Sequence, residues 1–254
     1  MGRQTMLTLY QFPISHYCEK ARWALDYKRL DYKIKNLFPG LHVMTAKRLA
    51  GASSLPILVH DGKVVQGSGE IIDYLEQVFP EHKLAPADDT LLADVLAWEK
   101  FVDGKIGVAV RIVCYHVLLD HPDILTPFFT RNAPWYGSIY MKIAFPNVAA
   151  RMRGLMNIND RTAALANRQL ARGIAKLSER LQHRPFLAGD TFTRADLSAA
   201  ALLAPLCKRP EFGLQWPGRF PGPLEEIIGQ YAEQLAWVHE VYNNYRRPKP
   251  SSKI

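Results

Sequence analysis

The chain has 254 residues, of which 48% are apolar, and this length is sufficient for one or two domains with substantial hydrophobic cores. No apolar stretch approaches the ~20 residues that cross a bilayer, and residues 1–10 lack the apolar run of a signal peptide, so we expect no membrane partner. The formal net charge of +8 is partly concentrated between Arg151 and Arg184, but there is no zinc-finger spacing, no aromatic RNA-binding signature and no glycine-rich phosphate loop, so we expect this charge to attract small anions and not nucleic acid.

The first eighty residues predict the order strand, helix, strand, helix, strand, strand, helix. The last two strands form a hairpin, because Asp61-Gly62 between two apolar runs is a strong turn signal. The strands are expected at residues 6–12, 31–37, 55–60 and 63–66, and the helices at 15–30, 44–51 and 69–79. This order is typical of a small thioredoxin-like α/β unit.

The second part of the chain is expected to be all-helical. Residues 80–89 have the composition of a loop and mark a boundary, which predicts one domain over 1–83 and another over 90–254. Helices are expected at residues 90–119, 160–183, 194–207 and 223–243, and a proline- and aromatic-rich loop with short helical turns at 119–141. Thr193 and Asp196 form a capping box, which we assign to folding.

A candidate catalytic turn joins the first predicted strand to the first predicted helix. Ser15 and Cys18 lie three residues apart, where a thioredoxin-type enzyme carries two cysteines. A helix N-terminus stabilises an anion, and a hydroxyl there can donate a hydrogen bond to a thiolate. Lowering a thiol pKa from about 8.5 to about 6.5 takes roughly 2.7 kcal/mol, which one charge-assisted bond and a helix end can supply. Alternatively, Ser15 only caps the helix.

Two further stretches have a functional and a structural interpretation. Pro56 opens a strand, either as an edge-strand proline or after a cis bond that would turn the backbone of Leu55 outward to pair with an extended peptide. Ser68 lies just ahead of the third predicted helix, where it can hold an anion or simply cap the helix.

The three cysteines (Cys18, Cys114 and Cys207) are odd in number and far apart, which predicts free thiols and a cytoplasmic location.

Taken together and in this order, these stretches resemble the cytosolic glutathione transferase superfamily. The matching segments are "FPISHYCEKARWAL", "LPILVHDGKVVQGSGEIIDYLE" and "FLAGDTFTRADLSAA". The resemblance is to the serine-type members (theta-, zeta- or omega-like) and leaves the class unassigned. It implies a thioredoxin-like glutathione-binding domain, an all-helical domain, a hydrophobic co-substrate site between them, glutathione as co-substrate, no metal, and a homodimer.

The resemblance also implies roles for single residues. Ser15 matches the serine that activates glutathione, and His42 is a candidate for its glycyl carboxylate. Leu55, Pro56 and Ser68 match the residue that pairs with the cysteinyl part, the cis proline, and the serine that receives the γ-glutamyl carboxylate.

Two positions depart from the family pattern. Gly67 stands where the family usually has an acid or amide, so that Gln66 is the nearest residue able to compensate. Ser54 stands where a lysine or arginine is frequent. Both departures predict a weaker hold on glutathione.

The sequence therefore predicts a detoxifying enzyme in which Ser15 steadies the glutathione thiolate for attack on a hydrophobic electrophile. Two alternatives stay open: a thiol transferase or reductase that uses Cys18, and a non-catalytic carrier of apolar anions with the same fold. Seven aromatic residues could line the second pocket or equally belong to an ordinary core. They are Trp98, Tyr115, Phe128, Phe129, Trp135, Tyr136 and Tyr140.

Overall fold

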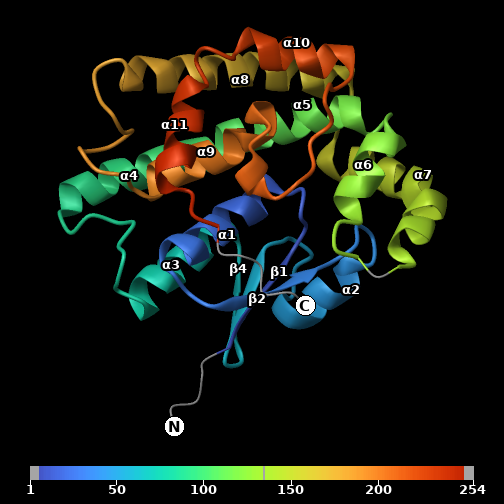
Figure 1. The fold of residues 1–254 in the computed structure, drawn as a ribbon, viewed down its shortest axis with the longest axis horizontal. Helices are drawn as coiled ribbons and strands as arrows, with labels where there is room; N and C mark the ends of the chain where they lie inside the picture. Colours follow the sequence, from blue (N-terminus) through green and yellow to red (C-terminus); the bar gives the residue numbers. More distant parts are fainter. Residues whose placement is uncertain (1–5, 134, 249–254) are drawn as a thin grey trace.

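The structure is a computed structural model that describes residues 6–133 and 135–248. Its first part contains a mixed four-stranded sheet (Figure 1). The strands are β1 (Leu7–Gln11), β2 (Tyr32–Asn36), β3 (Ile57–His60) and β4 (Lys63–Gln66), in the spatial order β2-β1-β3-β4. β1 pairs parallel with β2 and antiparallel with β3, and β3 and β4 form the hairpin. The predicted strand and helix order is confirmed.

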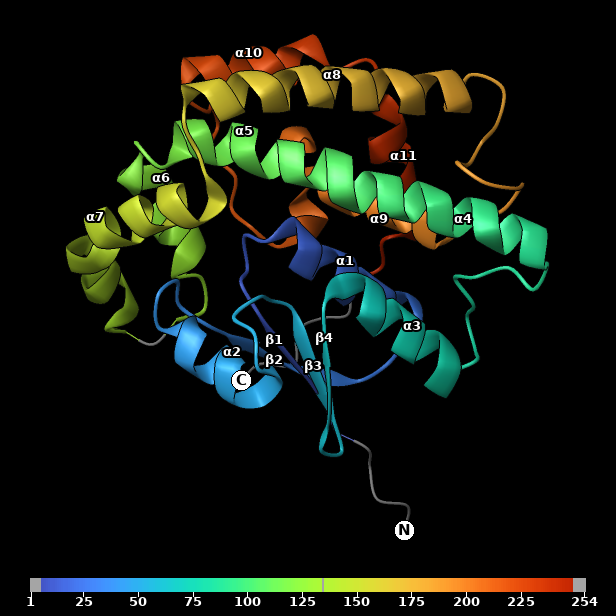
Figure 2. The same cartoon turned by 180° about the vertical axis from the view of Figure 1, so that it is seen from behind.

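Three helices accompany the sheet: α1 (His16–Tyr27), α2 (His42–Ala50) and α3 (Ser68–Val78). α1 and α3 lie between the sheet and the helices that follow (Figures 1 and 2). α1 carries little exposed surface, since Ala21, Trp23 and Leu25 are all fully buried. It is therefore the element on which both halves of the chain pack.

The rest of the described chain is helical. Its helices are α4 (Asp89–Phe101), the π-helical η1 (Val102–Gly107), α5 (Val108–Leu118), α6 (Pro122–Phe129), α7 (Gly137–Met156), α8 (Asp160–Leu181), α9 (Arg194–Cys207), the short 3-10 turn η2 (Pro210–Phe212), α10 (Gly222–Gln230) and α11 (Ala236–Tyr245). α9 runs through the centre and contacts α1, α4, η1 and α11. The capping box of Thr193 and Asp196 that starts α9 is confirmed, with the Asp196 carboxylate accepting from the Thr193 amide at 2.9 Å.

Three predictions about this helical part need correction. The helix expected at 90–119 contains a π-helical segment, the helix expected at 223–243 is divided into α10 and α11, and the loop expected at 119–141 is mostly α6 and the start of α7. Pro127 and Pro146 lie inside α6 and α7. The apolar side chains of these helices, such as Phe128 and Phe145, are buried in the core, and this tertiary packing outweighs the loop-like composition.

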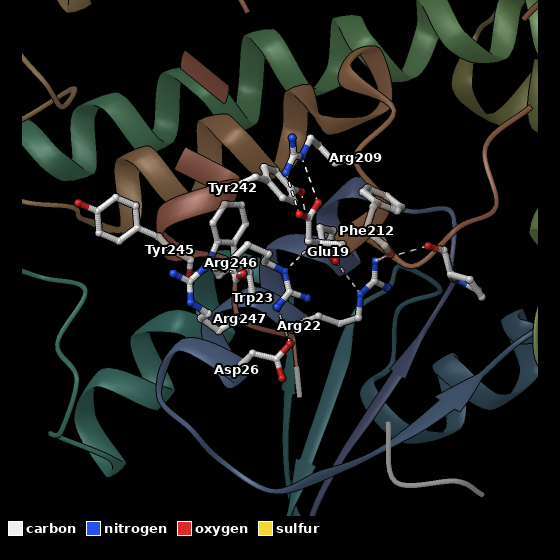
Figure 3. A network of polar contacts seen from close by, with 12 residues as sticks. Glu19, Arg22, Trp23, Asp26, Arg209, Phe212, Tyr242, Tyr245, Arg246 and Arg247 are labelled. Atoms are coloured by element: carbon white, nitrogen blue, oxygen red, sulfur yellow. Dashed lines mark hydrogen bonds and ion pairs between the residues drawn. The ribbon is translucent and has the colours of Figure 1, made fainter. Parts of the chain in front are cut away.

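A buried polar network ties the C-terminal end to α1 (Figure 3). Glu19 accepts from Arg22 Nε and Arg246 Nε, both at 2.8 Å, and Arg246 Nη1 donates to Asp26 at 2.6 Å. Arg22 also donates to Gln11 Oε1 at 2.5 Å. These charges are almost completely excluded from water, and each of them has an opposite charge at contact distance.

Candidate active site

The turn that carries Ser15 lies at one end of β1. The Ser15 amide donates to Phe12 O at 3.1 Å, and the Ser15 Oγ accepts from the Cys18 amide at 3.3 Å. Ser15 is therefore the N-cap of α1, as the structural interpretation of the sequence predicts. A serine hydroxyl has one proton to donate and two lone pairs, so a cap that uses Oγ as acceptor leaves the O–H as a donor. Capping and thiolate activation are thus compatible.

The sheet register brings the other two stretches to the same end. Tyr10 of β1 lies opposite Ile57, and Ile57 lies opposite Gln66. The residues just outside these pairs are the Ser15 turn, Pro56 and Gly67, and the Gly67 amide donates to Pro56 O at 3.0 Å. The Leu55–Pro56 peptide bond is cis, and Leu55 is half-buried.

The N-terminus of α3 differs from expectation. Ser68 does not cap this helix: it is its first residue, 6% exposed, and the cap is Gly67, which makes no side-chain cap bond. The first intrahelical bond runs from the Ile71 amide to Gly67 O at 3.0 Å. The amides of residues 68–70 therefore stand ahead of the first helical bond, which is the arrangement that attracts an anion.

Gly67 has a conformation that explains its identity. Its φ is +106°, where an L side chain is strained, and a Cβ placed there would lie 2.0 Å from Glu70 Oε2. The Glu70 carboxylate thus occupies the space that a side chain at position 67 would take. Gln66, the compensating residue that the sequence suggested, is engaged instead in bonds to Ala52 O at 3.1 Å and Ser54 O at 2.8 Å.

Glu70 is a candidate that the sequence analysis missed. It stands three residues after the N-cap, the position from which a glutamate side chain folds back over the start of its helix. That spacing from Gly67 was visible in the sequence. Its carboxylate places an acid at the edge of the α3 anion site. A ligand with both an ammonium and a carboxylate group could therefore pair its ammonium with Glu70 and its carboxylate with the amides at the start of α3.

His42 also lies at this end of the sheet. It is the first residue of α2, not part of a loop ahead of it, and its ring packs edge-on against Phe12 with centroids 4.7 Å apart. Burial lowers its pKa, while backbone hydrogen bonds to Phe38 and Ser53 act in the opposite direction. A neutral His42 can offer one N–H to an acceptor but contributes no full charge.

Cys18 has the environment of a packed residue. Its side chain is completely buried, and burial raises the pKa of its thiol, although a hydrogen bond with the Ser15 side chain acts in the opposite direction. A reactive cysteine needs both exposure and a lowered pKa. All three cysteines are free, as predicted.

The first turn of α1 is anchored to η1. His16 Nε2 bonds to Gly107 O at 3.0 Å, and the Tyr17 hydroxyl donates to Asp103 O at 2.6 Å. Burial lowers the pKa of His16 to about 3, so the ring is neutral and donates through Nε2–H. A Cβ on Gly107 would lie 2.7 Å from the Tyr17 hydroxyl, so the close approach of η1 to α1 requires glycine here.

Arg111 is a second residue that the sequence analysis missed. It lies on α5, and its positive charge lowers the pKa of both His16 and Tyr17, which places the guanidinium near the first turn of α1. Its buried Nε has no hydrogen-bond partner in residues 6–133 and 135–248. Arg111 is a single arginine in a largely apolar helical segment and belongs to no sequence motif, so the sequence alone does not mark it as a functional residue.

The aromatic residues proposed for a second pocket are dispersed. Phe128 and Phe129 belong to the core, and Trp98 lies under Lys176, whose Nζ is 5.0 Å from its ring centroid. Trp135 is 84% exposed. Tyr140 packs against Phe38 at 5.8 Å. The structure therefore does not gather this set into one pocket, and for Phe128 and Phe129 the core interpretation is correct.

Comparison with known proteins bears on the first part of the chain most directly. A family model described as "Glutathione S-transferase, N-terminal domain" matches residues 9–83. Glutathione S-transferase 1 of Dianthus caryophyllus is 40% identical over 85 residues, which cover 32% of this chain and 38% of that enzyme. Protein LigF of Sphingobium sp. strain SYK-6 is 28% identical over 211 residues, 77% of this chain and 72% of LigF. Residues 9–83 of this chain therefore match the N-terminal domain family of glutathione S-transferases.

Solved glutathione transferase structures share the whole fold. The crystal structure of the β-etherase LigF covers 96% of each chain with a TM-score of 0.64 and 24% identity, and glutathione transferase F7 of Populus trichocarpa covers 96% of this chain and 95% of its own with a TM-score of 0.63 and 17% identity. At these identities the likeness concerns the fold. Ser15, His42, Pro56 and Ser68 all lie within the range that the glutathione S-transferase N-terminal family model matches.

Proposed function

We propose that the protein is a glutathione transferase in which the Ser15 hydroxyl donates a hydrogen bond to the glutathione thiolate. The observation that carries the proposal is the Ser15 geometry: Oγ caps α1 by accepting from the Cys18 amide, and the hydroxyl proton remains available. The N-terminus of α1 adds a partial positive charge to this hydrogen bond. Both effects favour the ionised form of a bound thiol.

The tripeptide is proposed to lie across the end of the sheet. Its cysteinyl part would pair with the backbone of Leu55 beside Pro56, and its γ-glutamyl carboxylate would bind the amides and hydroxyl at the start of α3, where Ser68 lies. We assign the γ-glutamyl ammonium to the Glu70 carboxylate, which lies over Gly67. His42, against Phe12, would donate to the glycyl carboxylate.

The second substrate is proposed to be a largely apolar electrophile bound between α1 and α5, near Arg111. In the transfer, the thiolate sulfur forms a bond to carbon while the bond to the leaving group breaks. The broad match to LigF, a protein named as a β-etherase, favours an ether among the possible electrophiles. A departing oxygen would then leave as an oxyanion, which the Arg111 guanidinium is suited to stabilise before solvent protonates it.

The two alternatives are less well supported. A thiol transferase based on Cys18 would need a thiolate at a fully buried sulfur whose pKa is raised by burial. A non-catalytic carrier would make no use of the Ser15 hydroxyl. The homodimer, the cytoplasmic location and the domain boundaries, which the sequence analysis expects, remain predictions.

The proposal is tested by replacing Ser15 and Cys18 separately. We expect Ser15→Ala to lower the glutathione transfer rate by about 10–100-fold, because one hydrogen bond to a charged group contributes roughly 1.5–3 kcal/mol. Ser15→Asp keeps an acceptor for the Cys18 amide but repels a thiolate, so it should lose activity with the helix cap preserved. Cys18→Ala should retain most activity.

The ultraviolet absorbance of the bound thiolate, followed against pH, gives a direct readout. Ser15→Ala should raise the apparent pKa of the bound thiol. Loss of activity in Cys18→Ala but not in Ser15→Ala would move the assignment to thiol exchange. Tight binding of apolar dyes without transfer of glutathione would favour the carrier.

A further inference from the structure

α7 presents an exposed apolar stripe. Ile139 and Ile143 are 55% and 77% exposed, and Trp135, four residues before Ile139 and just ahead of the helix, is 84% exposed. Pro146 and Ala150 are exposed and continue the same helical face. An outer helix normally turns such a stripe toward the core, whereas α7 already buries a different face through Met141 and Phe145. The helix is therefore apolar on two sides.

α2 extends this apolar surface. Phe38 and Tyr140 pack with ring centroids 5.8 Å apart, and Asn36 Nδ2 donates to Arg131 O at 3.4 Å, so the segment before α2 lies against α7, as Figure 2 also shows. Leu41 and Met44 are 54% and 78% exposed. We call the following residues the α2–α7 face: Leu41, Met44, Trp135, Tyr136, Ile139 and Ile143.

The size of this surface exceeds ordinary scatter. Since a large side chain presents roughly 150–250 Å², the α2–α7 face exposes on the order of 500–800 Å² of mostly apolar area. The largest apolar patch of a typical monomer is about 300–600 Å² and is frequently functional. A patch of this size indicates a surface that meets a partner.

The charge of the two segments that bear this face is entirely positive. Residues 32–60 and 124–159 contain eight of the 32 lysines and arginines and none of the 24 aspartates and glutamates, so the rest of the chain carries 24 of each and is neutral. The whole formal charge of +8 thus comes from these two neighbouring segments.

The cations around the face differ in their pairing. Arg153 forms an ion pair with Asp120 at 2.7 Å, and Asp123 shares an open groove between α6 and α7 with Lys142. Lys142 and Arg151 flank the apolar stripe of α7 on either side and are exposed. Lys47 and Arg48, on the last turn of α2, are exposed as well.

We propose that the α2–α7 face docks the protein on a membrane surface that contains anionic lipid. Trp, Tyr and aliphatic side chains enter the headgroup boundary, while lysines and arginines beside them pair with lipid phosphates and carboxylates. None of the helices in residues 6–133 and 135–248 is suited to cross a bilayer, so the protein lies on the surface. The proposal departs from the sequence expectation of no membrane partner.

Charge and chemistry favour this occupant over two others. Across a two-fold axis, a second copy would set the same cations against each other, which is unfavourable. Nucleic acid would satisfy the cations, but its phosphates offer little to exposed Ile139, Ile143 and Met44. A bilayer with anionic headgroups matches both the apolar and the positive character of the surface.

The test is sedimentation of the full chain with vesicles. Binding is expected to vesicles of equal parts phosphatidylcholine and phosphatidylserine, to be much weaker with phosphatidylcholine alone, and to fall as salt rises. Trp135→Ala with Ile143→Ser should weaken binding at least about tenfold, because the apolar anchor is lost. Lys142→Glu with Arg151→Glu should do the same for anionic vesicles.

Matched controls lie on α8. Leu165→Ser removes another exposed apolar side chain, and Arg168→Glu with Arg172→Glu gives the same change of net charge. Circular dichroism confirms that each variant is folded. Binding that ignores the lipid charge, or α8 controls that lose as much binding as the α7 variants, overturns the proposal. So does a dimer in analytical ultracentrifugation that dissociates in Trp135→Ala with Ile143→Ser, or binding of duplex DNA in place of vesicles.

Discussion

The Ser15 hydroxyl shows how one small side chain can have two roles at the same time. Its oxygen accepts the Cys18 amide at 3.3 Å and thereby starts α1, while its proton is free to point at a ligand. Three residues later, the Cys18 thiol is sealed in the core, and burial raises its pKa. A nucleophile at this turn is therefore expected to come from a bound molecule, as the proposed function requires.

His16 makes the stability of the protein depend on pH. Its ring is buried and neutral, with a pKa lowered from 6.5 to about 3, so below pH 6.5 the unfolded chain binds a proton that the folded chain does not. Stability is therefore complete above about pH 6.5 and falls as the pH drops toward 3. His16→Gln keeps a donor for Gly107 O but has no group that titrates in this range. The difference in unfolding free energy between the native chain and this variant should therefore shrink by about 1 kcal/mol between roughly pH 6.5 and 5.5.

Urea unfolding of the two proteins at several pH values measures this difference. All other titrating groups are common to both chains and cancel. A constant difference across the range would show that the ring is not held neutral in the folded state.

Glu70 gives a prediction about ligand affinity. If its carboxylate receives the γ-glutamyl ammonium, Glu70→Gln should weaken glutathione binding by about 3–10-fold, since an exposed charge pair contributes only modestly. Isothermal titration with glutathione, and with an analogue that lacks the γ-glutamyl amine, measures the effect: the analogue should bind both proteins alike. Glu81→Gln, an exposed charge beyond the end of α3, is the control and should bind glutathione normally. An equal loss for both ligands would place Glu70 elsewhere in the site.

At the level of the element, the start of α3 depends on the backbone of Gly67. Gly67→Ala forces an L side chain to φ +106° and displaces the Glu70 carboxylate, so we expect a loss of about 1–2 kcal/mol in unfolding free energy together with weaker glutathione binding. Gly62→Ala is the matched control, because Gly62 also has a positive φ, +89°, but a Cβ added there would meet no atom within 4 Å. It should lose stability in thermal unfolding and keep its glutathione affinity. If both variants bind equally well, the backbone at Gly67 does not shape the site.

The elements also show how far sequence patterns reach. The seven elements of the first part follow from alternation, helical spacing and the Asp61-Gly62 turn, all of which are local signals. α6 and α7 escaped prediction because Pro127 and Pro146 interrupt their pattern, and their burial against distant helices is not a local property. Within the site, Ser15, Pro56 and Ser68 are marked by turn and cap chemistry. Arg111 is not, since only the fold brings α5 to α1.

On the scale of the whole molecule, ion pairs between distant segments connect the two parts of the chain. Lys20 on α1 contacts Glu99 on α4 at 2.8 Å, and Arg194 on α9 contacts the same carboxylate at 2.6 Å. On another side of α1, the neighbouring residue Glu19 lies between Arg22 and Arg246 (Figure 3). Such pairs contribute little net stability compared with apolar packing, but removal of one partner is costly. They fix the orientation of α1, and hence of the Ser15 turn.

Arg246 is the residue where this dependence is greatest. It is 4% exposed and pairs with both Glu19 and Asp26, so Arg246→Ala leaves Glu19 with Arg22 alone and leaves the buried Asp26 carboxylate without its ion-pair partner. We expect the unfolding free energy to fall by about 3–5 kcal/mol. A guanidinium chloride titration measures the free energy of unfolding of each variant. The neighbouring Arg247 is exposed, and Arg247→Ala should change this free energy by less than about 0.5 kcal/mol. Because burial already raises the pKa of Asp26, this carboxyl should take up a proton in Arg246→Ala at a higher pH than in the native chain, so the deficit should diminish as the pH is lowered. A deficit as small as that of Arg247→Ala would mean that water reaches the cluster and replaces the arginine, and that the C-terminal end does not hold α1 in place.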